Sequence, residues 1–144
     1  MPNKAKIKGT RVENELANLL WDMGYAVVRG PSSGAGVRRR FQPDLVAVKA
    51  GKVLVFEVKT YKGGGPLYIP RHQVEGLRDF AERAGALAFI AVRIHGGGWR
   101  LHRLEELPST RGGGARVDEP STGLRPRDLD EILFPTSRRI TEYL

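Results

Sequence analysis

The sequence contains no cysteine, and none of its 144 residues belongs to a hydrophobic run long enough to cross a membrane. The absence of cysteine excludes a disulfide framework and a zinc site of the thiolate kind. The N-terminal stretch MPNKAKIK is basic, but no apolar segment follows it, so it does not fit a secretory signal. We therefore expect a cytoplasmic protein with no membrane partner.

Acidic residues are also fewer than basic residues. The chain has 16 Asp and Glu against 24 Lys and Arg, which gives a formal net charge of +8. The basic excess lies before Leu104, and the remainder of the chain is slightly acidic. A basic body points to a polyanionic partner, of which nucleic acid is the commonest. A charge that serves only solubility is the alternative that composition leaves open.

Hydrophobic periodicity predicts an α/β domain with a central mixed β-sheet flanked by α-helices. Two helices are predicted, from about Gly9 to Tyr25 and from Arg71 to Ala84. The expected strands of the sheet span residues 26–29, 44–48, 53–59 and 86–94, with a hairpin partner that begins near residue 99. Gly51 is placed to supply the positive φ of a tight turn between the second and third of these strands.

Two stretches have the composition of irregular chain. Residues 30–42 are rich in glycine, serine and arginine, which predicts a mobile basic loop. Residues 108–123 are rich in proline, serine, threonine, glycine and arginine, which favours a linker or disordered segment before a short helix. The predicted organisation is a folded domain over residues 1–107, beginning with a basic arm over residues 1–8, and then a linker and tail over residues 108–144.

Charged residues interrupt the apolar strands of one predicted hairpin, PDLVAVKAGKVLVFEVKT. Asp44 opens one strand and Glu57 lies near the far end of the other, so antiparallel pairing brings the two carboxylates close together. Glu57 and Lys59 project from the same face, because side chains alternate along a strand. Two converging carboxylates repel each other unless a cation lies between them, and oxygen ligands suit Mg²⁺ or Mn²⁺ rather than zinc.

A lysine beside such a metal site can orient a water or stabilise charge that develops on a phosphate. Together with the basic surface, this arrangement indicates phosphodiester hydrolysis. The alternative is a charged strand edge on which Glu57 and Lys59 form an ordinary ion pair. The predicted hairpin that couples Asp44 to Glu57 favours the metal site.

The pattern Pro43-Asp44 followed by Glu57-Val58-Lys59 resembles the P-D…(D/E)-x-K nuclease superfamily. A longer likeness covers the chain from about Lys8 to Leu104. The stretches KGTRVENELANLLWDMGYAVVRGPSSG, PDLVAVKAGKVLVFEVK and YIPRHQVEGLRDFAERAGALAFIAV, with the GWR hairpin, resemble the archaeal Holliday junction resolvases. This resemblance implies a restriction-endonuclease-like fold, a homodimer, dependence on Mg²⁺ with Mn²⁺ as a substitute, and cleavage of four-way DNA junctions in recombination and repair.

The resemblance also implies roles for individual residues of the hairpin. Asp44 and Glu57 match the metal-binding acids of the family, and the main-chain carbonyl of Val58 is a further expected ligand. Lys59 matches the catalytic lysine.

Glu13 and a loop serine each have two interpretations. The resemblance matches Glu13 to an acid on the first helix that completes the metal site, but Thr10 and Glu13 also fit a capping box that would begin this helix. Ser33, in RGPSSG, matches a serine that the family uses in catalysis, with Ser32 one residue away. A loop serine is commonly only a turn residue.

We expect DNA to contact the basic residues around this site. Gln73 matches a family glutamine near the site, although a solvated helix residue is an equal interpretation. The N-terminal lysines have the alternative of a frayed, solvated terminus. The expected DNA-binding residues are Lys4, Lys6, Lys8, Arg11, Arg29, Ser32, Arg38, Arg39, Arg40, Lys62, Arg71 and Gln73.

Together these features predict a Mg²⁺-dependent enzyme with a nuclease domain over residues 1–107. The enzyme is expected to resolve Holliday junctions by paired cleavage, as a homodimer associated with the nucleoid. Two alternatives are another nuclease of the superfamily, which acts on nicks, flaps or ends, and a non-catalytic DNA-binding protein. The apolar fragments ILF and ITEYL of the tail fit docking on a partner such as a sliding clamp.

Overall fold

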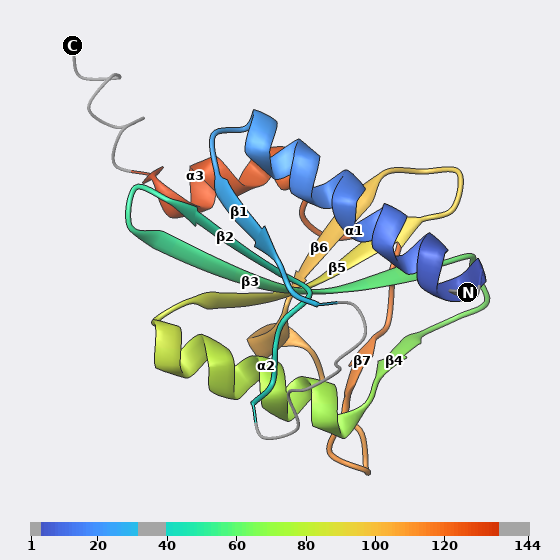
Figure 1. Ribbon diagram of the computed structural model, residues 1–144. Coiled ribbons are helices and arrows are strands. Elements are labelled where there is room, and N and C mark those ends of the chain that lie inside the picture. Colours follow the sequence, from blue (N-terminus) through green and yellow to red (C-terminus); the bar gives the residue numbers. More distant parts are fainter. Residues whose placement is uncertain (1–3, 32–39, 136–144) are drawn as a thin grey trace.

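The computed structural model describes residues 4–31 and 40–135, with side chains from Gly9 onward in the first range. The helices and strands, in chain order, are α1 (Lys4–Asp22), β1 (Ala26–Arg29), β2 (Leu45–Lys49), β3 (Lys52–Tyr61), β4 (Leu67–Ile69), α2 (Arg71–Ala84), β5 (Leu87–Ile94), β6 (Trp99–Arg103), η1 (Leu104–Glu106), β7 (Ala115–Val117), η2 (Pro126–Asp128) and α3 (Leu129–Leu133). This order confirms the predicted α/β class (Figure 1).

Five strands form the central sheet in the order β1-β2-β3-β5-β6. β3 and β5 run parallel, as expected of strands joined through the helix α2, and the other neighbours are antiparallel. The predicted tight turn joins β2 to β3, where Gly51 has a φ of 79° and Ala50 a φ of 47°. A glycine tolerates this left-handed conformation without steric strain.

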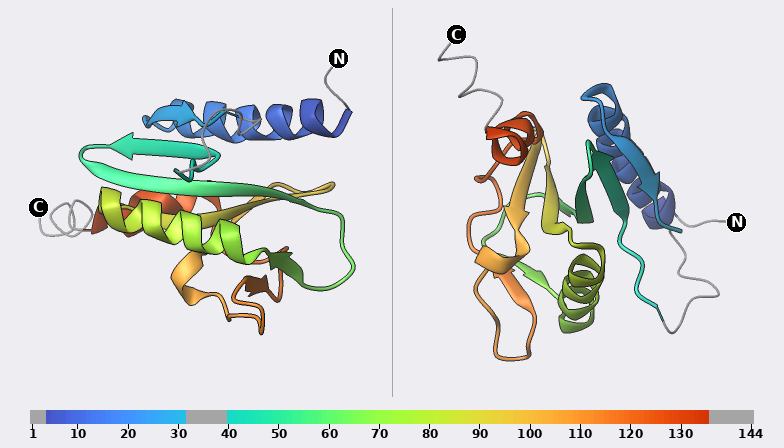
Figure 2. Two further views of the ribbon diagram at one scale, coloured as in Figure 1. Left: turned by 60° about the horizontal axis from the view of Figure 1, so that its bottom comes forward. Right: turned by 90° about the vertical axis from the view of Figure 1, so that its left-hand side faces the viewer.

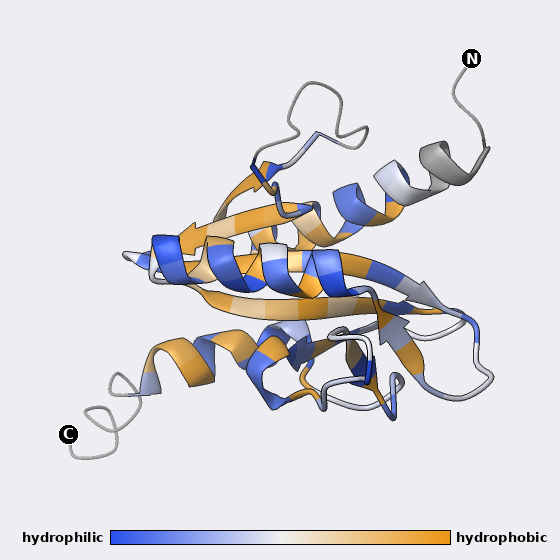
Figure 3. Ribbon diagram, turned by 90° about the horizontal axis from the view of Figure 1, so that it is seen from below, coloured by the Kyte–Doolittle hydropathy of each residue, from blue (hydrophilic) through white to orange (hydrophobic). Residues whose placement is uncertain are grey.

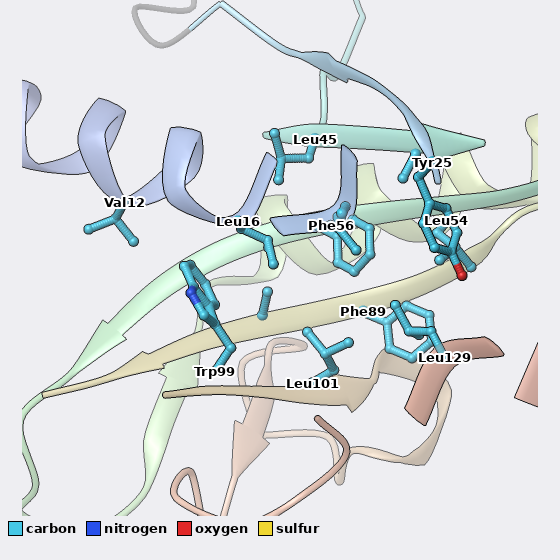
Figure 4. Packing of buried hydrophobic residues seen from close by; sticks show 13 residues of the cluster. Val12, Leu16, Tyr25, Leu45, Leu54, Phe56, Phe89, Trp99, Leu101 and Leu129 are labelled. Carbon is cyan, nitrogen blue, oxygen red and sulfur yellow. The ribbon is translucent and has the colours of Figure 1, made fainter. Parts of the chain in front are cut away.

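The two faces of the sheet are covered by different helices, with α1 on one side and α2 on the other (Figure 2). On the α1 side the core includes Leu16, Leu20 and the stacked rings of Phe56 and Phe89, whose centroids are 5.6 Å apart (Figure 4). On the α2 side, Val74 and Leu77 pack against β3 and β5. Seen from that side, α2 covers the middle of the sheet and leaves hydrophobic strand segments beside it (Figure 3).

The first helix begins earlier than predicted. It starts at Lys4 rather than near Gly9, so the basic arm assigned to residues 1–8 is wrong from Lys4 onward. Lysine and alanine have high helix propensity, and residues 4–8 carry nothing that would end the helix. Thr10 is therefore inside the helix, and the capping box between Thr10 and Glu13 is also wrong.

The predicted linker after Pro108 is wrong as well. β7 pairs with β4 in a second, two-stranded sheet, in the register Tyr68↔Arg116. Leu124 then bridges to Leu101 of β6, and Leu129 of α3 is fully buried in the α1-side core. Composition cannot reveal pairing between strands about fifty residues apart, each only three residues long. The short helix predicted within residues 125–134 is confirmed by η2 and α3.

None of the described helices has the length and hydropathy that crossing a membrane would require.

Candidate active site

The site lies where β3 loses a neighbour. β2 begins at Leu45, which pairs with Phe56, so the rest of β3 is bonded to β5 on one side and has no β2 partner on the other. Asp44 immediately precedes β2, and its Oδ2 accepts a hydrogen bond from the Val58 amide at 2.8 Å. This bond ties the carboxylate to the open edge of β3. We call this region, formed by Glu13, Asp44, Glu57 and Lys59, the notch.

Glu57 is the most unusual side chain of the notch. Among the residues that the structure describes, it is the one buried polar or charged side chain, 5% exposed. Burial raises the pKa of Glu57 to about 8, and the neighbouring charge of Asp44 adds to the rise, while Lys59 opposes it. A buried carboxylate is costly unless it is paired or bound to a metal, so the surroundings of Glu57 favour either a proton or a further cation.

Asp44 meets the same environment. Burial is the main reason that the pKa of Asp44 is raised. The hydrogen bond from the Val58 amide and the charge of Lys59 both favour its ionised form, but they do not reverse the shift. Asp44 and Glu57 also interact directly, so the two carboxyl groups form one coupled pair.

Glu13 approaches Asp44 and Glu57 from α1, the helix on the face of the sheet opposite α2 (Figure 2). Its side chain is 12% exposed, and its Oε2 lies 3.5 Å from Nη1 of Arg29 on β1. Burial raises the pKa of Glu13, and the charge of Asp44 raises it further despite the arginine. The mutual influence of Glu13, Asp44 and Glu57 means that three acids from three parts of the chain share one electrostatic environment.

Lys59 connects the notch to α2. Its Nζ donates a hydrogen bond to Oε1 of Gln73 at 2.5 Å. Gln73 lies in the first turn of α2, so the helix start holds the lysine beside the acids. Lys59 opposes the rise in the pKa of both Asp44 and Glu57. The ion pair between Glu57 and Lys59, which was the alternative to a metal site, is not formed as a direct salt bridge among the described residues.

The donor set of the notch fits a hard divalent cation. Its atoms are carboxylate oxygens whose pKa values are raised mainly by burial, and a main-chain carbonyl at Val58 lies in the same strand segment. In the described part of the chain, however, no three histidine or acidic side chains are grouped so that they would hold a metal by themselves. Glu13 instead faces Arg29, whose guanidinium supplies positive charge at that position.

The remaining predicted residues are dispersed around the notch. Arg11 and Lys62 are exposed and line a hollow between α1 and the ends of β3 and β5. Arg71 is exposed and pairs with Glu75 at 2.7 Å. Arg40 borders a separate hollow near α2. Outside the described residues lie Ser32, Ser33, Arg38 and Arg39, and the side chains of Lys4, Lys6 and Lys8.

Residues 4–138 match the family described as "Archaeal holliday junction resolvase (hjc)". The chain belongs to this family. Its relatives include the crossover junction endodeoxyribonuclease Hjc of Sulfurisphaera tokodaii, 37% identical over 142 residues, which cover 99% of this chain and 96% of that protein. The enzyme of the same name from Archaeoglobus fulgidus is 38% identical over 95% of this chain and 89% of its own.

A solved structure agrees with the family assignment. The 1.6 Å structure of Archaeoglobus fulgidus Hjc, described as a Holliday junction resolvase from an archaeal hyperthermophile, matches with a TM-score of 0.69 and 37% identity. The match covers 77% of this chain and 88% of that chain. The predicted restriction-endonuclease-like fold is thereby confirmed.

Two sets of contacts were not predicted from the sequence. Arg29 was expected to contact DNA alone, but it also forms an ion pair with Glu13 across the α1–β1 connection. A polar cluster lies at the end of β2 farthest from Asp44, where Lys49 donates to both carboxylate oxygens of Asp130 at 3.1 Å. No sequence signal links Lys49 to a residue 81 positions away, because only the fold brings α3 against β2.

Proposed function

We propose that the protein is an endonuclease that resolves four-way DNA junctions and depends on Mg²⁺. Its relatives are named crossover junction endodeoxyribonucleases, which supports the junction substrate. The observation that carries this proposal is the notch of a basic protein, where the buried carboxyl groups of Asp44 and Glu57 lie beside Lys59 and share their electrostatic environment with Glu13. Mn²⁺ would substitute, since it accepts the same oxygen ligands.

Asp44 and Glu57 would hold the cation, with the main-chain carbonyl of Val58 as a third ligand. Glu13 would complete the set when its carboxylate turns from Arg29, which would be left free to bind a DNA phosphate. A bound divalent ion supplies Lewis acidity, which activates water and neutralises charge on the phosphate that is attacked. The Val58 amide keeps Asp44 oriented in either state.

Lys59 would act on the reacting phosphate. Gln73 holds its ammonium group beside the acids, so no rearrangement is needed to present a donor to the non-bridging phosphate oxygens. The same group would orient the attacking water. In this scheme Gln73 positions Lys59 and is also one of the proposed DNA contacts.

Ser33 is proposed to contribute from the loop that precedes β2, with Ser32 as a DNA contact. The proposed phosphate contacts are Lys4, Lys6, Lys8, Arg11, Arg29, Arg38, Arg39, Arg40, Lys62, Arg71 and Gln73. Arg29 and Gln73 bond directly to residues of the notch, whereas Arg11 and Lys62 line the hollow beside α1. An enzyme with this substrate works on the chromosome, so we propose that it is associated with the nucleoid.

A homodimer follows from the symmetry of the substrate. Resolution requires two nicks in strands of like polarity, and each chain provides one notch, so an isologous dimer presents two equivalent sites. We propose that the partner copy packs on the β1–β2 face beside α2, where Val28 and Val48 are 68% and 37% exposed. A partner such as a sliding clamp is proposed for the tail, where Ile132 is 37% exposed.

The test is cleavage of a plasmid that extrudes a cruciform and of a synthetic four-way junction, each with Mg²⁺, with Mn²⁺ and with chelator. We expect paired nicks that linearise the plasmid, no cleavage in chelator, and a dimer by light scattering. Linear duplex cut as fast as the cruciform would instead favour a nuclease that acts on nicks, flaps or ends. Binding without cleavage in either metal would favour a non-catalytic DNA-binding protein.

A further inference from the structure

A second basic surface lies on the other flank of α1. A groove of about 640 Å³ runs between α1, the β5–β6 hairpin and η2. Its apolar floor includes Leu19, Met23 and Trp99, and Trp99 is only 5% exposed beneath α1 (Figure 4). Four arginines line the same groove: Arg93, Arg100, Arg125 and Arg127. We call it the α1–η2 groove.

The basic surface continues beyond this groove. The hollow that contains Arg11 and Lys62 has a volume of about 230 Å³ and shares Glu15 and Arg93 with the α1–η2 groove. The two hollows are therefore neighbours. They connect the N-terminal half of α1 to the segment around η2, which is more than sixty residues further along the chain than Lys62.

The α1 helix separates this surface from the notch. Glu13 and Glu15 are two residues apart, which places them about 200° apart around a helix with 3.6 residues per turn. Glu13 faces Arg29 and Asp44 on the β1 side. Glu15 faces the opposite side, where its Oε1 accepts bonds from Arg93 Nε at 2.8 Å and Trp99 Nε1 at 3.1 Å.

The charge of the groove is unbalanced. Within the described ranges, Glu15 is the single acid that lines either hollow, and Arg93 already neutralises it. Arg125 and Arg127 are exposed, and no carboxylate of the described residues forms an ion pair with them. Excess positive charge beside an apolar floor is complementary to a chain of phosphates rather than to a single small anion.

We propose that the α1–η2 groove binds the phosphate backbone of a second duplex arm, while the notch holds the arm that is cut. The inference rests on the proposed nuclease function. A linear duplex at the notch would have to cross the α1 ridge, about 10 Å in diameter, before it met the groove. A branched substrate sends arms to both flanks, so the groove would contribute to selection of branched over linear DNA.

The experiment compares the double variant Arg125→Gln/Arg127→Gln with the wild-type protein in chelator, where binding is measured without cleavage. Both arginines are exposed, so we expect an unchanged melting temperature. Affinity for a four-way junction and for linear duplex of the same sequence is measured over a series of salt concentrations. The matched control, Lys52→Gln/Arg111→Gln, removes the same charge from exposed positions that line neither hollow.

Loss of two phosphate contacts should weaken junction binding by roughly ten-fold or more at physiological salt and lower the salt slope by about two. Duplex binding should stay at the wild-type value, and the control should match the wild type on both substrates. Unchanged junction affinity, or an equal loss on junction and duplex, would overturn the inference. Cleavage by the wild-type protein is a separate readout, so failure of the nuclease function would be recognised independently of the groove.

Discussion

The two ends of β2 carry charged clusters of opposite character. At its start, Asp44 meets Glu57 and Glu13, and burial is the main reason that the pKa of each of these three acids is raised. The acids also outnumber the cations beside them. At its end, Lys49 donates to Asp130 and to the Met23 carbonyl, the latter at 2.9 Å. Tyr25 completes that cluster with a hydrogen bond to Asp130 at 2.9 Å.

The two clusters differ in the source of the charge that balances them. Lys49 and Asp130 neutralise each other within the chain, and the cluster docks α3 on the β1–β2 side of the sheet. The notch lacks such internal balance, which stability alone would disfavour. An imbalance of this kind indicates a site where an external cation or substrate contributes. The following predictions test that contrast.

The largest effect is expected from the acids of the notch. Asp44→Asn and Glu57→Gln should each lower the cleavage rate by about three orders of magnitude or more, because each removes a proposed metal ligand. Junction affinity should be retained or increased, since a negative charge is lost. Asp130→Asn, at the other end of β2, serves as the matched control and should cleave at a near-normal rate. Loss of folding in both notch variants would support a structural role instead.

Glu13→Gln should lower the cleavage rate by about a hundred-fold, with little change in melting temperature. The reasons are that Glu13 shares the electrostatic environment of Asp44 and that it caps no helix end. Single-turnover kinetics and thermal unfolding on the same preparation provide the measurement. Full activity of this variant would remove Glu13 from the site.

The notch should make the metal-free protein less stable as the pH rises. Because the pKa of Glu57 is raised from 4.5 to about 8, the folded state retains a proton that the unfolded chain releases between these values. The free energy of unfolding in chelator should therefore fall by on the order of 2 kcal/mol from pH 5 to pH 8. Glu57→Gln should flatten this profile, and Mg²⁺ added at pH 7 should release protons. A flat wild-type profile would contradict the electrostatic account.

The serine prediction concerns the loop that precedes β2. Ser33→Ala should slow cleavage by about ten-fold while it changes junction binding less, because a single hydroxyl contact to the reacting phosphate is lost. Ser32→Ala is its neighbouring control and should have the smaller effect on rate. The opposite order would shift the assigned role by one residue.

The smallest effect is expected at the balanced end of β2. Lys49→Met should lower the free energy of unfolding by about 1 kcal/mol, because the pair with Asp130 is partly exposed to solvent. Cleavage should be unaffected at temperatures well below unfolding. Chemical denaturation of this variant, of Asp130→Asn and of the double variant would measure the coupling between the two residues. A loss of cleavage in the folded Lys49→Met protein would contradict the contrast between the two ends.

Much of the fold followed from local pattern. Apolar periodicity located α2 and its buried face, and β-branched runs around Gly51 located the β2–β3 hairpin. The start of α1 was predicted wrongly, and the pairing of β7 with β4 was missed because residues 108–123 were expected to form a linker. The first depended on helix propensity in a segment dominated by charge, and the second on a contact distant in the sequence.

The sequence by itself determined which chemical groups are available: two acids and a lysine in one hairpin, an acid on the first helix, and an excess of basic residues with no thiols. Only the tertiary structure decided how they meet. The register Leu45↔Phe56 leaves the edge of β3 open at Glu57, and the phase of α1 sends Glu13 to the notch and Glu15 to the opposite groove. Register and helix phase depend on packing of the whole core, so no short segment specifies them alone.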